Sequence, residues 1–276
     1  MGNKRFEGWY FKHQLENNTV ALIPGRSVNG AFIQILLPNG ARFYKTHGLS
    51  VKEDEIYTGN CVFSPHGCKI ELPGVQGKIE YGTITPLRSD IMGPFRFFPM
   101  ECRHGVISMA HSLRGSLTVG GTDYIFDGGT GYIEKDSGIS FPGSYQWIQC
   151  NDFPEPCAMM VSIARIPFGT IHFTGCICAI IYRGREYRIA TYNGVRILLA
   201  NETHICLSQR NLQLNIEISP FNSGHSLKAP VYGLMTGTVR ERINAEIHIR
   251  LWEHHQLIFD LRSPYAAYEY VAPKNS

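Results

Sequence analysis

Short runs of β-branched and aromatic residues, separated by glycine and proline, recur along the chain and limit what it can fold into. The runs are about four to eight residues long, and 28 Gly and 15 Pro stand among them. This pattern is typical of strands joined by turns. No window of about a dozen residues keeps a helical period of apolar side chains. We therefore expect an all-β protein with short, peripheral helices.

The expected strands and the length of the chain together predict two domains. The expected strands are 6–13, 31–37, 107–119, 124–126, 131–136, 145–151, 158–165, 170–183, 187–192, 196–199, 212–218, 245–252 and 265–271. At roughly 150 residues per domain, the 276 residues suggest two domains or one large all-β unit. Residues 138–144 are loop-rich, so we expect domains at 1–140 and 141–276, each of the size that closes a small β-barrel or sandwich.

Charge and hydropathy exclude several classes of protein. Lys plus Arg number 26 and Asp plus Glu 23, so the net charge of +3 is too small to attract a polyanion, and we expect no nucleic-acid partner. The longest apolar stretch, 158–182, is interrupted by Arg165, Pro167 and His172, which excludes a membrane-spanning helix there. Because the first residues lack the apolar region of a signal peptide, we expect a cytoplasmic protein.

Common catalytic motifs are absent from the sequence. It contains neither a Walker phosphate loop nor a complete dinucleotide-binding glycine motif. The sequence around Ser140 resembles a nucleophile elbow, but Pro142 replaces its closing glycine. There is no HExxH motif, and the adjacent His254 and His255 would point to opposite faces of a strand, so we expect no metal site. The eight cysteines are scattered without a CxxC pair, which is typical of buried, reduced thiols.

The densest cluster of polar and aromatic residues lies at 131–151. Since alternate residues of a strand share a face, Tyr132, Glu134 and Asp136 lie on one side, with the two carboxyl groups about 7 Å apart. Two partly buried like charges raise the pKa of one of them, and a carboxyl group that stays protonated near neutrality can act as a general acid. The alternative is a solvated face beside Lys135, or an ion pair at the domain junction.

Two further strands carry candidate binding residues. Tyr145, Trp147, Gln149 and Asn151 share one face, which resembles a cavity wall with a few orienting groups. An exposed aromatic strand or a hydrogen-bonded core network would give the same pattern. His111 aligns with apolar neighbours and is expected to point inward. It is either a satisfied core histidine or a group that holds a ligand hydroxyl.

Both faces of the first expected strand are too apolar for the edge of a sheet. Trp9 and Phe11 lie on one face, and Phe6 and Tyr10 lie on the other. We therefore expect a central strand between a core and a cavity.

Four segments resemble the tocopherol cyclase family. They are FEGWYFK at 6–12, HSLRGSL at 111–117, GYIEKDSGISFPGSYQWIQCN at 131–151, and the late IRLWE. Their order and spacing extend over nearly the whole chain, and the match is closer to bacterial members than to the plant cyclases. The resemblance implies two lipocalin-like β-domains and a cofactor-free isomerisation that closes a ring between the phenol oxygen and the prenyl alkene of a hydroquinone.

This chemistry needs an acid, an aromatic lining that shields a tertiary cation, and a group that holds the phenol. The motif positions supply these as Asp136 or Glu134 for the acid, Trp9, Tyr10, Phe141, Tyr145 and Trp147 for the lining, and His111 or Gln149 for the phenol. The implied partner is an apolar, isoprenoid-like molecule, with a peripheral membrane contact as an open possibility.

The chain departs from the family pattern at Ser137, where the cyclase motif has Trp. This removes an aromatic residue next to the expected acid and puts tocopherol itself in doubt as the product. Two alternatives to a cyclase therefore stay open. A non-catalytic carrier would return its apolar ligand unchanged. A structural interaction module fits poorly, because polar groups align with aromatic residues in several strands.

Overall fold

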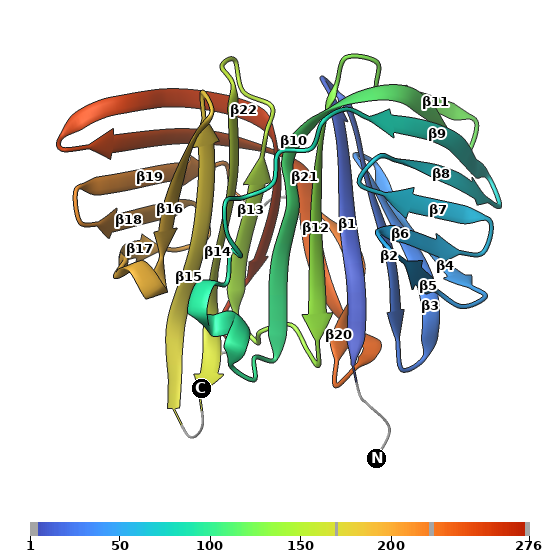
Figure 1. Ribbon diagram of the computed structural model, residues 1–276, viewed down its shortest axis with the longest axis horizontal. Helices are drawn as coiled ribbons and strands as arrows, with labels where there is room; N and C mark the ends of the chain where they lie inside the picture. Colours follow the sequence, from blue (N-terminus) through green and yellow to red (C-terminus); the bar gives the residue numbers. More distant parts are fainter. Residues whose placement is uncertain (1–4, 169–170, 221–223, 274–276) are drawn as a thin grey trace. The chain divides into compact units, whose positions relative to one another are not determined.

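The computed structural model describes residues 5–168, 171–220 and 224–273, and the chain forms two compact units (Figure 1). The first unit contains the chain up to Leu87 together with Met100–Phe141 and His225–Thr238, and the second contains the remainder. The chain thus passes between units next to the expected boundary at 140/141. Two short segments are exchanged relative to the expected ranges of 1–140 and 141–276. Arg88–Pro99 belongs to the second unit, and His225–Thr238 belongs to the first.

The first unit is built on one curved antiparallel sheet (Figure 1). The strand order is β4-β3-β2-β1-β12-β10-β9-β8-β7-β6-β5, and β11 pairs with β10. Its strands are β1 Phe6–Leu15, β2 Asn18–Ser27, β3 Gly30–Leu37, β4 Gly40–Thr46, β5 Ser50–Lys52, β6 Glu55–Thr58, β7 Cys61–Ser64, β8 Gly67–Leu72, β9 Val75–Tyr81, β10 Cys102–Val119, β11 Thr122–Ile125 and β12 Thr130–Gly138.

The second antiparallel sheet has the order β16-β15-β14-β13-β22-β21-β19-β18-β17, and β20 pairs with β21. Its strands are β13 Tyr145–Cys150, β14 Cys157–Phe168, β15 Ile171–Tyr182, β16 Arg185–Ala190, β17 Arg196–Ala200, β18 His204–Gln209, β19 Leu212–Ile218, β20 His225–Val231, β21 Leu234–Glu253 and β22 Gln256–Val271. Within the described ranges the helices are two short 3-10 turns, η1 Gly93–Phe97 and η2 Thr191–Asn193, so the all-β prediction is confirmed. No helix among these residues could cross a membrane.

Each sheet curls around a hydrophobic core of its own. In the first unit, Trp9, Phe11 and Ile133 pack into one buried cluster, and in the second unit Ile148 and Cys150 pack into another. The architecture is the pair of lipocalin-like β-domains that the sequence predicted. β1 lies between β2 and β12, so its predicted central position is confirmed.

The expected strands coincide with observed ones, although several observed strands are longer. The strands β2, β4 to β9, β18 and β20 were not expected. The expected strand at 187–192 ends earlier, because Thr191 begins η2. Thr170, the expected first residue of another strand, lies outside the described residues.

β10 contains two irregularities that determine which way its side chains point. The register against β12 shifts between Val106 and Ser108 and again between Ser108 and His111. Each extra residue is a β-bulge, which changes the face on which the following residues lie. Because the two extra residues cancel, even-numbered residues of β10 lie on the same face before and after the bulges, and Ser108 between them is out of phase.

Candidate active site

A histidine and two carboxyl groups meet on the face of the first sheet opposite its hydrophobic core. His104 on β10 pairs with Asp136 on β12, and Val106 pairs with Glu134. The Nδ1 atom of His104 lies 2.8 Å from Oδ1 of Asp136, and its Nε2 atom lies 3.3 Å from Oε2 of Glu134. One imidazole ring therefore links the two carboxyl groups that the sequence placed on one face.

Two further polar groups border this array. The hydroxyl of Tyr132 donates to Oε2 of Glu134 at 2.6 Å, and the Sγ atom of Cys102 lies 3.9 Å from Oδ1 of Asp136. The side chain of Glu134 is 6% exposed and that of Asp136 is 22% exposed. Asp136 is thus the more accessible carboxyl group of the array.

Burial and the neighbouring charges together shift the pKa values of the groups in the array. Burial lowers the pKa of His104, but Glu134 and Asp136 outweigh it through charge and hydrogen bonding and hold the pKa well above its usual range. Burial raises the pKa of Glu134, against the opposing effect of His104, and the Asp136 carboxylate raises it further. Burial also raises the pKa of Tyr132 and Cys102, with the nearby carboxylates adding to it. The array therefore retains protons at neutral pH.

The same three side chains supply one nitrogen and two oxygen donors that a divalent cation could use. One ligand atom from each of His104, Glu134 and Asp136 lies within 4.8 Å of the others, a grouping that the sequence analysis did not anticipate. However, the two ring nitrogens of His104 each face a different carboxyl group. This arrangement fits a hydrogen-bonded chain in which a proton is shared.

His111, the third expected catalytic residue, lies on the other face of the same strands. It pairs with Gly131, and an ideal Cβ atom built on Gly131 would lie 2.2 Å from its Nε2 atom. Alternate residues of β12 point to opposite faces, so His111 faces the core while Glu134 and Asp136 face away from it. The structure therefore places His111 on the opposite face of the sheet from Glu134 and Asp136.

Around His111 the core holds a second polar cluster. Its Nδ1 atom lies 3.0 Å from Oγ of Ser108, and its ring centroid lies 4.6 Å from that of Tyr81. The hydroxyl of Tyr81 lies 2.6 Å from Nε2 of His13, whose Nδ1 atom lies 3.2 Å from the carbonyl oxygen of Val20. Burial lowers the pKa of His13 to about 3 and that of His111 to about 4. Both histidines are neutral at neutral pH.

The expected aromatic lining divides between the two faces. Trp9 packs into the core of the first unit, with the Nζ atom of Lys135 4.6 Å from its ring centroid. Tyr10 pairs with Glu134 and shares its face. Phe141 packs edge-on against Phe6 at 5.4 Å between ring centroids. Phe6 and Tyr10 are an even number of residues apart on β1 and therefore share a face. Together with Phe141 they form the aromatic group on the face of the array.

Ser137 also lies on the core side of β12. It pairs with Glu7 on β1 and with Arg103 on β10, and it is out of phase with Asp136. An aromatic side chain at this position would not stand on the same face as the acid. The expectation that Ser137 removes shielding from the acid is therefore corrected.

The other three expected binding residues belong to the second unit. Tyr145, Trp147 and Gln149 lie on the face of β13 opposite Ile148 and Cys150, which belong to the core. The hydroxyl of Tyr145 donates to Oε2 of Glu269 at 2.5 Å. The Gln149 side chain is fully buried, and its amide atoms have no hydrogen-bond partner among the described residues. A buried amide of this kind is a candidate for binding a polar group of a ligand.

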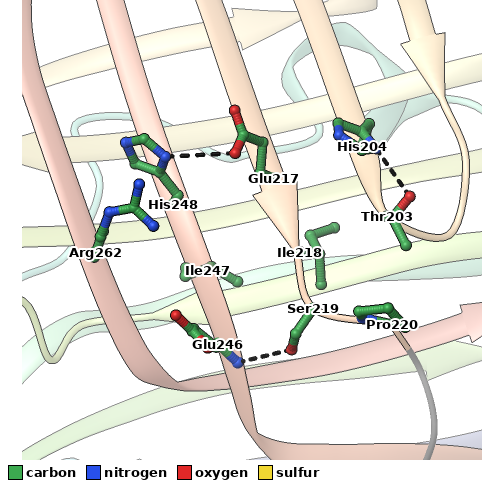
Figure 2. Close-up of a pocket in the computed structure, with 10 residues that line it drawn as sticks. All are labelled: Thr203, His204, Glu217, Ile218, Ser219, Pro220, Glu246, Ile247, His248 and Arg262. Atoms are coloured by element: carbon green, nitrogen blue, oxygen red, sulfur yellow. Dashed lines mark hydrogen bonds and ion pairs between the residues drawn. The ribbon is translucent and has the colours of Figure 1, made fainter.

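An open pocket of about 450 Å³ lies on the second unit and has a different character (Figure 2). Figure 2 shows His248 facing Glu217 with Arg262 beside it. His248 lies 3.5 Å from Glu217 and 2.5 Å from Asp260. The lining also includes His204 and Glu246, but none of the expected site residues. This charged surface does not suit a prenyl chain.

His104 is the residue of the array that sequence reasoning missed. The expected strand began at Ile107, so the alternation of Cys102, His104 and Val106 was not read as part of it. The two bulges of β10 interrupt the pattern at this point. The polar residues in CRHG, directly before an apolar run, were the available signal.

The fold places the chain in a class of two-unit β-proteins with solved members. The crystal structure of CghA with Sch210972 covers 97% of this chain and 88% of its own, with a TM-score of 0.61 and 9% identity. Kievitone hydratase from Nectria haematococca covers 96% of this chain and 88% of its own, with a TM-score of 0.52 and 11% identity. At these identities the similarity shows the fold.

The family follows from the sequence match. The sequence model of the tocopherol cyclase-like family matches residues 74–271, which is most of the chain. The chain therefore belongs to this family. Tocopherol cyclase from the chloroplast of Zea mays is 24% identical over 213 residues, and the corresponding protein of Oryza sativa subsp. japonica is 26% identical over 206 residues. The matched region is 68% of this chain but 43% and 44% of the plant proteins, so it spans less than half of their length.

Proposed function

We propose that this protein closes a ring in a prenylated hydroquinone or a related isoprenoid by proton-initiated isomerisation. The observation that carries the proposal is the buried array of Glu134, His104 and Asp136, which retains protons at neutral pH. Membership of the tocopherol cyclase-like family supports the same type of reaction. Protonation of an unactivated alkene requires a positioned acid, and this array supplies one.

In the proposed reaction the imidazolium of His104 supplies the proton, and Asp136, the more exposed carboxyl group, passes it to the substrate. The proton adds to one carbon of the alkene, and the other carbon becomes a tertiary cation. The phenol oxygen attacks this cation, a carbon–oxygen bond closes the ring, and the phenol proton returns to Asp136. Between turnovers Glu134 and His104 hold the proton, so that the array stays able to donate it. The product is an isomer of the substrate, and these steps use no cofactor.

Aromatic side chains stabilise the cation. Phe6, Tyr10 and Phe141 stand on the face of the array, and the electron-rich face of an aromatic ring attracts a cation. In the second unit we retain Tyr145, Trp147 and Gln149 as proposed substrate-binding residues. The fully buried amide of Gln149 is suited to a phenol hydroxyl, which both donates and accepts a hydrogen bond.

The proposed reaction also has consequences for the partners of the protein and for its location. The substrate is an apolar small molecule with a polar phenolic end, and nucleic acid is not a partner. We propose a cytoplasmic location with a peripheral contact to a membrane, because a prenyl chain partitions into lipid.

The test is an incubation of the purified protein with a panel of prenylated hydroquinones in deuterated water, followed by chromatography and mass spectrometry. Ring closure preserves mass in ordinary water, so solvent deuterium bound to carbon in the product reports the protonation step. We expect a chroman with one carbon-bound deuterium. Recovery of the ligand unchanged, although it is retained by the protein, would contradict the proposal and establish a carrier.

A further inference from the structure

Three chain segments at one end of the first unit expose apolar side chains side by side. They are the β2–β3 turn with Val28, the loop after β12 with Ile139, and the β20–β21 hairpin with Val231, Tyr232 and Leu234 (Figure 1). These five side chains are between 36% and 67% exposed, and Tyr232 is the most exposed. Exposed apolar residues that are scattered singly need no explanation, whereas a contiguous group marks an interaction surface.

Backbone hydrogen bonds hold the three segments together. The amide of Val28 donates to the carbonyl oxygen of Gly233 at 2.9 Å, and the amide of Gly233 donates to that of Ile139 at 2.7 Å. The amide of Tyr232 donates to Oγ of Ser140 at 2.9 Å. The polar atoms of the turns are therefore satisfied from within, and the apolar side chains are left to project outward. This group is called the apolar tip below.

Basic side chains lie directly behind the apolar tip. One row of paired residues crosses β2, β1, β12 and β10, and it consists, in that order, of Arg26, Glu7, Ser137 and Arg103. Arg26 and Arg103 are exposed. Glu7 is already neutralised, since its carboxylate contacts Arg26 at 2.6 Å and Lys135 at 2.5 Å. Lys45, one row further along on β4, is also exposed.

We propose that the apolar tip and its basic row dock the protein on a lipid bilayer that carries anionic headgroups. Apolar and aromatic side chains at loop ends insert at the boundary between headgroups and acyl chains, and a hydroxyl such as that of Tyr232 remains at the headgroups. Arg103, Lys45 and the one positive charge that Arg26 and Lys135 keep after pairing with Glu7 complement the negative surface. The inference rests on the proposed function for its purpose, because a prenylated substrate resides in the bilayer.

The test is co-flotation of the full chain with vesicles of phosphatidylcholine, with and without phosphatidylglycerol. The variant Tyr232→Ser/Leu234→Ser removes two side chains of the tip. The matched control is Ile125→Ser/Val51→Ser, whose exposed apolar residues lie on β11 and β5 of the same unit. We expect the wild type and the control to float with anionic vesicles. The partition coefficient of the tip variant should be lower by at least about tenfold. Equal flotation of all three would overturn the proposal.

A second readout separates this proposal from the proposed function. With substrate in detergent micelles, the tip variant should turn over like the wild type, because the tip is not part of the proton array. Binding of wild type and control to anionic vesicles without any turnover would leave the docking surface standing and contradict the enzyme. Turnover without flotation of the wild type would contradict the docking surface. Equal binding to purely neutral vesicles would contradict the role of the basic row.

Discussion

The two faces of the sheet formed by β1, β12 and β10 carry histidines whose pKa values burial lowers alike and that nevertheless differ in charge. On the core side, His13 and His111 have pKa values of about 3 and about 4, because burial is the dominant effect. On the opposite side, the pKa of His104 lies well above its usual range although burial opposes this, since two carboxyl groups flank the ring. The partners, and not the depth of burial, decide which face can supply a proton.

This contrast makes a histidine on the core side a poor candidate for acid chemistry. A neutral imidazole with a depressed pKa cannot hold a proton in reserve at neutral pH. The core cluster therefore holds neutral imidazoles, and Nδ1 of His111 contacts Ser108 on the bulged strand. The array on the other face combines titratable groups of opposite charge, which is the usual composition of a site that transfers protons.

The largest expected effect comes from removing the acid. Asp136→Asn should lower turnover by about 10²- to 10⁴-fold, the usual contribution of a general acid, while the dissociation constant for the substrate stays within about threefold, because the lost interaction is made in the transition state. Single-turnover rates and equilibrium binding measure the two quantities. Asp54→Asn, at an exposed site of the same unit, is the control. Unchanged turnover in Asp136→Asn would exclude Asp136 as the acid.

The next variant, His104→Gln, removes the ring that links the two carboxyl groups. Because the folded-state pKa of His104 is raised, its stabilisation is fully present below the unfolded pKa of about 6.5 and is lost as the pH rises through the folded value. Urea denaturation across alkaline pH should therefore show a decline for the wild type and a flatter profile for the variant, with turnover reduced at least about tenfold.

His66→Gln provides the control for this variant, since His66 is an exposed histidine of the same unit. It should keep both the alkaline decline and the activity. An identical pH profile in His104→Gln and the wild type would mean that the carboxyl groups do not hold a charged imidazole.

The core side predicts the opposite pH dependence. Since the folded-state pKa of His13 is lowered to about 3, its contribution is present above about pH 6.5 and is lost as the pH falls toward 3. The loss amounts to about 2 kcal/mol of the free energy of unfolding between pH 6.5 and 5. His13→Gln should remove about half of the acid decline, because His111, with a pKa of about 4, contributes a similar loss, and it should leave turnover of the folded protein unchanged. A decline as steep as that of the wild type would contradict the assignment.

The smallest expected effect concerns the space that His111 occupies. A Cβ atom at Gly131 would lie 2.2 Å from Nε2 of His111 and 2.8 Å from Cδ2 of Leu113. Gly131→Ala should therefore lower the free energy of unfolding by about 1–3 kcal/mol, as measured by urea denaturation. Gly40→Ala, where a Cβ atom meets nothing within 4 Å, should show less than about 1 kcal/mol. Equal losses in the two variants would exclude crowding by His111 as the cause.

Periodicity within single strands predicted much of the fold. The alternation in 6–13 and 131–136 identified β1 and β12, and the shared face of Tyr132, Glu134 and Asp136 is confirmed by the hydrogen bond from Tyr132 to Glu134 and the contacts of His104 with both carboxyl groups. The strands β5 to β9 were missed because several are short and alternate with turn residues, which leaves little periodic signal.

The composition of the site could not be predicted in the same way. Period two sorts residues within a strand, but it does not say which faces of two strands coincide, and that depends on the register between them. Gly131 and Tyr132 were equally possible partners for the face of His111 until the register was known. The two bulges of β10 then placed Ser108, between them, out of phase with a count in twos from either His104 or His111.

The most direct test of the proton array is an NMR titration of the histidine side chains with ¹⁵N-labelled protein. His104→Gln, His13→Gln and His111→Gln assign the signals. The account predicts that His104 remains an imidazolium above pH 7, whereas His13 and His111 stay neutral down to at least about pH 5. A neutral His104 at pH 7 would contradict the claim that this face of the sheet holds the proton for catalysis.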